Sequence, residues 1–139
     1  MQYSRIIGLD YGEVRIGIAF SDLLQVISSP YETYKRKELS QDLSYLSKLI
    51  KEKQVSLIVL GLPLNMDGTE GDRAIKTREF GALLSKETGL EVVYIDERLT
   101  SLEAEEMLIE AKVRREKRKQ LIDQIAAQII LETYLKSNK

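Results

Sequence analysis

The 139-residue chain contains no histidine and no cysteine. These two absences exclude a Ser-His-Asp triad, a thiolate nucleophile and a zinc site built from imidazole or thiolate groups. If the protein is an enzyme, its proton or metal chemistry must rest on carboxylates, Lys, Tyr, or Ser and Thr. The hard oxygens of carboxylates suit Mg²⁺, Mn²⁺ or Ca²⁺.

The chain also lacks a long hydrophobic run and a strong net charge. No apolar stretch approaches the about 18 residues of a membrane span, so we expect no membrane contact and a cytoplasmic protein. The 21 Lys and Arg nearly balance the 22 Asp and Glu. A site for nucleic acid must therefore be a local patch. The length and the composition, 43% hydrophobic and 31% charged, predict one globular domain over residues 1–139.

Hydrophobic periodicity predicts a mixed α/β fold. Strands are expected at residues 4–10, 15–21, 26–35, 56–60 and 91–95, and helices at 38–53, 70–88, 100–110 and 121–135. Thr69 with Asp72, and Thr100 with Glu103, resemble capping boxes at two of the helix starts. Three early strands followed by alternating helices and strands predict a mixed sheet with helices on both faces.

Acidic residues stand out at three places. Asp10 ends an apolar strand before a glycine-containing turn, Asp96 and Glu97 end another, and Asp123 lies in the apolar stripe of the last helix. Functional groups gather at the carboxyl ends of strands in open α/β sheets, so these acids could converge there. Close carboxylates are costly to bury unless they are paired or bind metal, and such a metal site would suit phosphoryl transfer.

Each acid also has a simpler structural explanation. Asp10 could hydrogen-bond its own turn, Asp96 or Glu97 could pair with Arg98, and Asp123 could cap a helix that begins late. Asp96 and Glu97 would point to opposite faces of an extended strand, so only one of them can easily join a shared site. The spacing does not decide which one.

Two segments favour phosphate. The loop at residues 61–71 runs from a strand end into a helix N-terminus, where free backbone N–H groups attract anions, although it is not a Walker A loop. The basic run at 112–119 (KVRREKRK) could bind a nucleic-acid backbone. An ordinary capped loop and a solvated or disordered charge run are the alternatives for these two segments.

Four blocks of this sequence resemble the YqgF/RuvX family. They are GLDYG at 8–12 with RIG at 15–17 and Ser21-Asp22; GLPL at 61–64 with MDGTEG at 66–71; DERLTS at 96–101 with Glu103-Ala104; and DQIAA at 123–127 with Ile130-Leu131 and Tyr134-Leu135. The match spans nearly the whole chain, in the family's order and at its length.

The resemblance implies a ribonuclease-H-like fold, related to the Holliday junction resolvase RuvC. The sheet would have five strands, the first three antiparallel and the rest parallel. The resemblance also implies that Asp10, Glu97 and Asp123 are catalytic and hold one or two Mg²⁺ or Mn²⁺ ions. Family members are proposed to trim the 5′ end of precursor 16S ribosomal RNA or to resolve Holliday junctions.

We therefore expect a metal-dependent nuclease that processes the 5′ end of pre-16S rRNA, with the four-way DNA junction as the alternative substrate. The chain would contact nucleic acid through Arg15, Gly68, Thr69, Arg98, Lys112, Arg114, Arg115, Lys117, Arg118 and Lys119. The 112–119 run would be a mobile arm, and the helix starting near Thr69 would hold phosphates.

Three further hypotheses about the function and assembly of the protein remain open at this point. A non-catalytic module that binds RNA or a ribosome-assembly partner would use the basic arm alone. An actin-like ATPase or sugar kinase needs two lobes, and this chain has room for one. A homodimer would suit a resolvase that cuts two strands symmetrically.

Overall fold

The computed structural model describes residues 3–138. Along this part of the chain the elements are β1 (Arg5–Tyr11), β2 (Arg15–Ser21), β3 (Ser28–Lys35), α1 (Leu39–Glu52), β4 (Val55–Leu62), α2 (Asp72–Thr88), β5 (Val92–Asp96), α3 (Thr100–Glu110) and α4 (Arg115–Ser137). The predicted order of strands and helices is confirmed, with shifts of a few residues at most boundaries and a larger one at α4.

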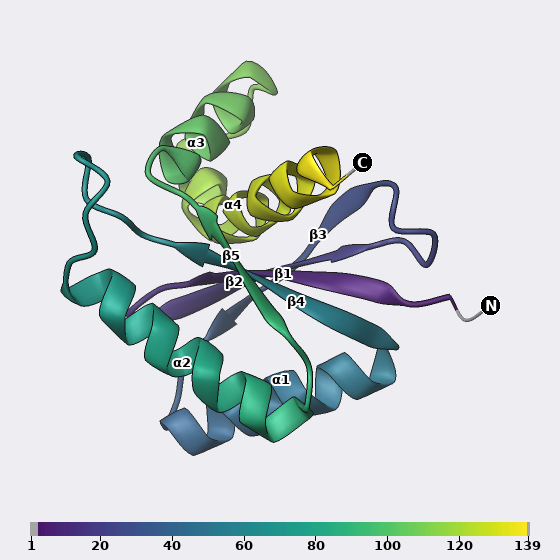
Figure 1. Ribbon diagram of the computed structural model, residues 1–139. Coiled ribbons are helices and arrows are strands. Elements are labelled where there is room, and N and C mark those ends of the chain that lie inside the picture. The colour runs from purple at the N-terminus through teal and green to yellow at the C-terminus, as the bar shows by residue number, and fades with distance from the viewer. Residues whose placement is uncertain (1–2, 139) are drawn as a thin grey trace.

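The strands form one five-stranded sheet in the order β3-β2-β1-β4-β5. β1, β2 and β3 are antiparallel neighbours, whereas β4 and β5 run parallel to β1. Helices α1 and α2 cover one face, and α4 with α3 lies on the other (Figure 1). The predicted mixed sheet with helices on both faces is confirmed.

The alternation of side chains along β1 divides the core between the two faces. Ile7 and Leu9 pack on the side of α1 and α2, in a cluster that includes Phe80. Ile6 packs on the opposite side, with Leu131 of α4. Because successive strand residues point to opposite faces, Asp10 lies on the α4 side of the sheet.

Helix α4 approaches the sheet closely because glycines lie beneath it in three adjacent strands. A Cβ on Gly17 of β2 would collide with the backbone carbonyl oxygen of Asp123. On Gly8 of β1 it would lie 2.7 Å from Cβ of Leu131, and on Gly61 of β4 it would lie 2.5 Å from Cδ1 of a third α4 residue, Ile130. The three glycines thus set the distance between α4 and the sheet.

The structure corrects the prediction for the basic run at 112–119. Helix α4 begins at Arg115 rather than at 121, so residues 115–119 form helix and not a mobile arm. Arg, Lys and Glu are good helix formers, and the side chain of Arg118 donates a hydrogen bond to the carbonyl of Val113 (3.0 Å). The packing of Ala104 in α3 against Ala126 in α4 further fixes this end of the molecule.

Both predicted capping boxes are wrong. Helix α2 begins at Asp72 with Gly71 as its N-cap residue, because the Thr69 hydroxyl instead donates to Asp67 (2.6 Å). Helix α3 begins at Thr100, which is already helical, and neither helix has a side-chain cap. A local turn therefore closes before α2, and the helix starts three residues after Thr69.

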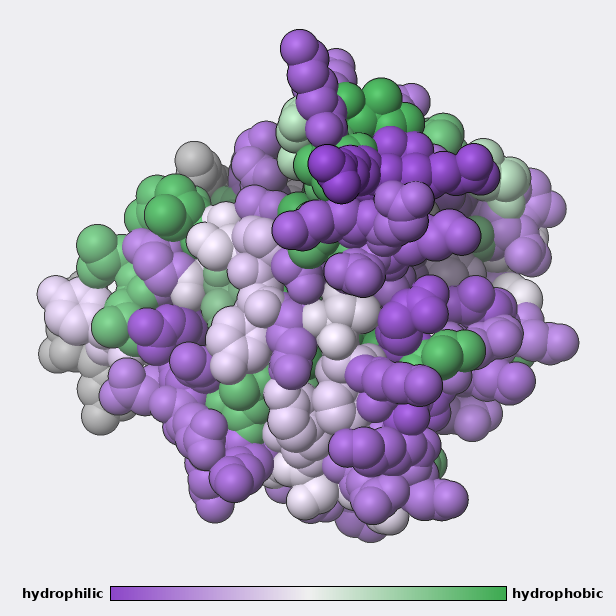
Figure 2. All heavy atoms as spheres, turned by 180° about the vertical axis from the view of Figure 1, so that it is seen from behind, coloured by the Kyte–Doolittle hydropathy of each residue, from purple (hydrophilic) through white to green (hydrophobic). Residues whose placement is uncertain are grey.

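Seen from behind, the molecule is covered mainly by hydrophilic side chains, with a group of apolar ones to the left (Figure 2). Three exposed apolar residues lie in the β2–β3 connection: Leu24, Val26 and Ile27 are each at least 60% exposed. Among the described residues, no helix is long and apolar enough to cross a membrane.

The close approach of α4 can be tested by adding one methyl group. We expect Gly17→Ala to lower the free energy of unfolding by about 1–3 kcal/mol or more, because α4 must move away from the sheet. Urea unfolding measures this change. Gly71→Ala is the control, since its Cβ would meet only the flexible amide of Asn65, at 3.1 Å. Equal stability of the two variants would contradict the packing argument.

Candidate functional site

The carboxyl ends of the parallel strands β1, β4 and β5 meet at one edge of the sheet. A groove of about 480 Å³ opens there, between the β1–β2 turn, the start of α2 and the middle of α4. Its charged lining residues are Asp10, Glu13, Arg15, Arg73, Glu97, Arg98 and Asp123. The groove therefore brings together the acids at two strand ends and one acid from a helix.

Asp10 and Glu97 are in contact. The backbone N–H of Glu97 donates to the carbonyl of Leu62 (3.2 Å), which extends the pairing beyond β5. Glu97 thereby continues the alternation from Ile95, which packs on the α4 side, so its carboxyl turns toward Asp10. The two side chains share a hydrogen bond in which the protonated Glu97 donates to the Asp10 carboxylate.

This contact changes the titration of both groups. Burial raises the pKa of Asp10, partly opposed by the hydrogen bond from Glu97. Burial, together with the negative charge of Asp10, raises the pKa of Glu97 to about 9. The pair therefore keeps one proton at neutral pH.

Asp96 has a different role from its neighbour. Its carboxylate is exposed and accepts hydrogen bonds from the backbone N–H (3.0 Å) and the Nε (2.9 Å) of Arg98. This partner lowers the pKa of Asp96. Asp96 thus takes the ion-pair role, and Glu97 is the acid that faces the groove.

Asp123 lies inside α4, so it does not cap that helix. Its carboxylate accepts a hydrogen bond from Nε of Arg15 at 2.8 Å, and its charge contributes to the raised pKa of Asp10. Within residues 3–138, no three carboxylates lie close enough to form a ready metal-ligand cluster. The three predicted acids therefore share one groove, but only Asp10 and Glu97 touch.

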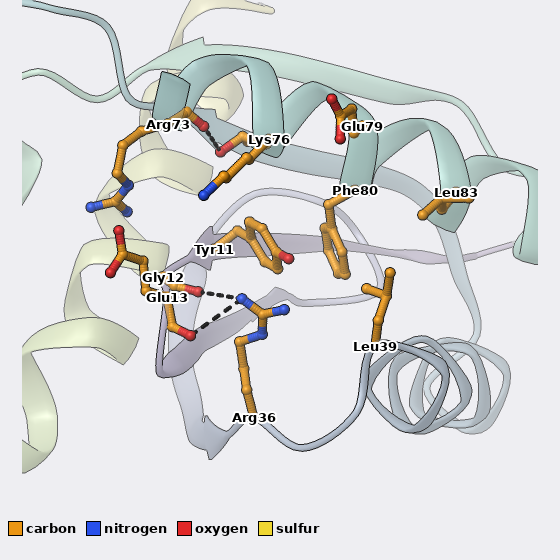
Figure 3. Close-up of a pocket in the computed structure, with 11 residues that line it drawn as sticks. Tyr11, Gly12, Glu13, Arg36, Leu39, Arg73, Lys76, Glu79, Phe80 and Leu83 are labelled. Atoms are coloured by element: carbon orange, nitrogen blue, oxygen red, sulfur yellow. Dashed lines mark hydrogen bonds between the residues drawn. The ribbon is translucent and has the colours of Figure 1, made fainter. Parts of the chain in front are cut away.

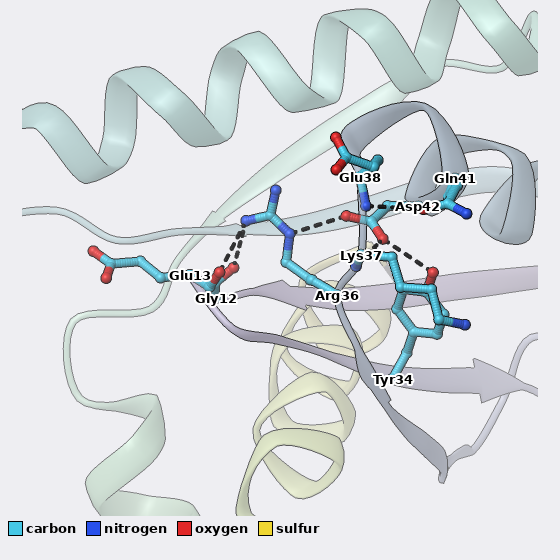
Figure 4. A network of polar contacts seen from close by, with 8 residues as sticks. All are labelled: Gly12, Glu13, Tyr34, Arg36, Lys37, Glu38, Gln41 and Asp42. Atoms are coloured by element: carbon cyan, nitrogen blue, oxygen red, sulfur yellow. Dashed lines mark hydrogen bonds and ion pairs between the residues drawn. The ribbon is translucent and has the colours of Figure 1, made fainter.

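A buried polar network holds the β1–β2 turn that borders the groove (Figure 4). The fully buried Asp42 accepts hydrogen bonds from the Tyr34 hydroxyl (3.0 Å) and from Nε of Arg36 (3.1 Å). Arg36 in turn donates to the carbonyls of Gly12 (3.1 Å) and Glu13 (3.3 Å). The turn after Asp10 is thus tied to the start of α1.

Arg73 lines the groove, although no sequence pattern singled it out. It lies in the first turn of α2, and its positive charge lowers the pKa of both Asp10 and Glu97, against the larger effect of burial. The order of the elements could have identified Arg73. Helix α2 follows β4, so the first turn of α2 must lie at the edge where β4 ends.

Only some of the predicted phosphate contacts lie in the groove. Arg15 and Arg98 line the groove. Gly68, with φ +90, and Thr69 lie in a loop that Arg98 holds by donating to the carbonyl of Met66 (3.2 Å). None of the predicted basic contacts between 112 and 119 lines the groove; they are Lys112, Arg114, Arg115, Lys117, Arg118 and Lys119.

The RuvX family profile, described as "Holliday junction resolvase", matches residues 4–137. The chain belongs to the RuvX family. A Syntrophomonas wolfei protein named "Putative pre-16S rRNA nuclease" is 52% identical over 131 residues, which are 94% of this chain and 93% of that protein. An Agathobacter rectalis RuvX relative of the same name is 47% identical over 134 residues, 94% of each chain.

Two solved structures have the same fold as this RuvX chain. One is T. thermophilus RuvC in complex with a Holliday junction substrate, with a TM-score of 0.62, 12% identity, and coverage of 97% of this chain and 96% of that one. The other is the fowlpox virus resolvase with Holliday junction DNA, with a TM-score of 0.62, 12% identity, and coverage of 96% and 98%. They confirm the predicted ribonuclease-H-like architecture.

The shared proton of Asp10 and Glu97 predicts a pH-dependent stability. An unfolded glutamate loses its proton at about pH 4.3, whereas folded Glu97 keeps it up to about pH 9. The folded state binds more protons in this window, so the free energy of unfolding falls as pH rises through it. The melting temperature, measured in EDTA, should therefore fall as the pH rises. We expect the substitution Glu97→Gln to make this fall smaller.

Glu105→Gln is the matched control, because Glu105 is an exposed acid on α3. Its melting temperature should follow that of the unchanged protein across the pH series. Parallel curves for all three proteins would show that the Asp10–Glu97 pair is not protonated as described.

Proposed function

We propose that this chain is a nuclease that hydrolyses phosphodiester bonds and processes the 5′ end of pre-16S rRNA. The observation that carries the proposal is the contact between two half-buried carboxylates, Asp10 and Glu97, in a groove that also contains Arg15 and Arg73. The cations suit a reaction in which negative charge builds up on phosphate oxygens, and the paired acids suit a divalent metal ion that would stabilise the same charge. The names of the curated relatives support the choice of substrate.

The residues of the groove fit a divalent metal ion. Two carboxylates in contact repel each other once both are ionised, and a cation between them removes that cost by replacing the shared proton. Carboxylate oxygens are the ligands that Mg²⁺ and Mn²⁺ prefer. Asp10 and Glu97 would hold the ion, and Asp123, which lines the same groove, would join them once Arg15 releases it. A bound ion would supply Lewis-acid stabilisation of the reacting phosphate.

The cations of the groove differ in how readily they can bind a phosphate. Arg15 is paired with Asp123, and because the guanidinium is half exposed this pair costs little to open. Arg73 makes no ion pair with any described residue, so it can hold a phosphate oxygen directly. Without histidine in the chain, protons leave through a carboxylate, a lysine or solvent.

Four-way DNA is the second candidate substrate. The description of the matching family profile favours it, and the two resolvases of the same fold were solved with, or named for, Holliday junctions. A symmetric cut of two strands would require two copies of the chain, and this homodimer stays a prediction.

Cleavage by Asp10→Asn tests the assignment of the site. We expect this variant to cut pre-16S RNA or a four-way DNA junction at least about 10²-fold more slowly than the unchanged protein, because it removes one carboxylate of the central pair. Asp96→Asn is the control, since it alters an exposed acid that pairs with Arg98. Gel assays with Mg²⁺ or Mn²⁺ measure both rates on both substrates.

Two outcomes would contradict this proposal. If folded Asp10→Asn cuts as fast as the unchanged protein, the site is wrongly assigned. If the unchanged protein cuts neither substrate and binds RNA equally well with and without metal, it is a non-catalytic binding module.

Metal binding can be measured without any substrate. We expect Mn²⁺ to raise the melting temperature of the unchanged protein, with about 2.7 kcal/mol of stabilisation at a hundredfold excess over the dissociation constant. The effect should increase with pH, because the ion displaces the proton of Glu97. Asp10→Asn should lose most of the shift and Asp96→Asn should keep it. Equal shifts in all three proteins would exclude metal binding by this pair.

A further inference from the structure

A second cavity lies beside the groove, on the opposite face of the sheet. It has a volume of about 410 Å³, is open to solvent on one side and is bordered by the β1–β2 turn, the start of α1 and the side of α2 (Figure 3). The groove and the cavity share three lining residues, Gly12, Glu13 and Arg73. The groove and this cavity are therefore neighbours, with Arg73 between them.

One wall of the cavity is apolar and flat. The ring of Tyr11 stacks on that of Phe80, with centroids 4.0 Å apart and an interplanar angle of 12°. Leu39 and Leu83 extend this wall to the mouth of the cavity, where they are 41% and 42% exposed. Phe80 is only 2% exposed and the Arg36 guanidinium lies over the Tyr11 ring, 4.5 Å from its centroid, so the two leucines supply the apolar surface that a planar group such as a nucleobase could bury.

One end of the cavity is basic. Arg73 and Lys76 lie three residues apart on α2 and so project from the same side of that helix (Figure 3). Neither side chain forms an ion pair with a described residue, whereas Arg36, the third cation of the cavity, is bound to Asp42. Arg73 and Lys76 can therefore hold an anion without breaking an existing contact.

The charges of the cavity limit the anion that it can hold. Glu13 and Glu79 also line it, and Arg36 is already paired with Asp42, so Arg73 and Lys76 are the cations left for an anion. These two cations suit a single phosphodiester, which carries one negative charge. A dense phosphate backbone would meet the two acids as well and would be disfavoured.

We propose that this cavity binds one unpaired nucleotide of the substrate, next to the bond that is cut. Arg73 and Lys76 hold its phosphate, and its base lies against the exposed side chains of Leu39 and Leu83. The proposal rests on the proposed nuclease function, since the strand held at Asp10 and Glu97 supplies the nucleotide. A base inside a duplex is stacked and cannot enter, so the cavity selects strands with an unpaired flank.

The test compares two RNA hairpins that differ only in an unpaired 5′ extension. Fluorescence anisotropy with the full chain in EDTA measures binding while cleavage is off. We expect the extended hairpin to bind about tenfold more tightly than the blunt one, as one buried base provides. Lys76→Glu and Leu83→Asp should each reduce this preference to about twofold or less.

Matched controls lie on the same helix, outside the cavity. Lys86→Glu makes the same charge change and Ile75→Asp the same apolar-to-acidic change at exposed positions of α2. Both should keep the full preference. A 2-aminopurine at the first unpaired position should change its emission on binding to the unchanged protein and not to Leu83→Asp. The chain has no tryptophan, so this signal is easily isolated.

The outcomes separate this proposal from the proposed function. Equal binding of the two hairpins, or a preference that survives both Lys76→Glu and Leu83→Asp, overturns the nucleotide site even if the protein cuts RNA. A preference that depends on Lys76 and Leu83 supports the site even if a separate assay with metal detects no cleavage, a result that would count only against the nuclease.

Discussion

The architecture of the site depends on how closely α4 lies against the sheet. Gly17 pairs with Asp10 in the β1–β2 ladder, so a glycine stands beside the strand acid at the point where α4 passes. Asp123 lies directly above that glycine. Any larger side chain at position 17 would push α4 outward and separate its acid from the strand acids. The packing of a helix thus determines whether three carboxylates share one groove.

The same packing explains why an unfavourable contact persists. Asp10 and Glu97 are positioned by backbone that the core fixes: Asp10 by the β1 ladder, and Glu97 by its hydrogen bond to Leu62. The backbones of these two residues cannot separate without breaking sheet pairing. The repulsion is reduced by the shared proton and by the charge of Arg73. Local conflicts of this kind are expected at functional sites, where the rest of the fold compensates for them.

Sequence periodicity was sufficient for the strands, the helices and the convergence of the acids, but not for details that depend on tertiary contacts. The spacing left Asp96 and Glu97 open and the family resemblance pointed to Glu97. The packing of Ile95 on the α4 side gives the physical reason why Glu97 faces the groove. The helical state of residues 115–119 is supported by the hydrogen bond from Arg118 to the carbonyl of Val113, which a charge pattern does not contain. The pattern of Thr69 and Asp72 predicts a helix start at Thr69, and this prediction is wrong. The Thr69 hydroxyl bonds to Asp67 instead of capping the helix, and the sequence pattern does not show this competition.

The end of β1 places one functional side chain on each face of the sheet. Asp10 and Tyr11 are consecutive and therefore point in opposite directions, the acid into the groove under α4 and the ring into the cavity beneath α2. Arg73 reaches both hollows from the start of α2. In the proposed arrangement, a nucleic-acid strand that crosses this edge places one phosphate at the acids and the next nucleotide beside Leu39 and Leu83. The proposed selection for an unpaired flank would then combine the end of β1 with residues of α1 and α2 that border the same edge.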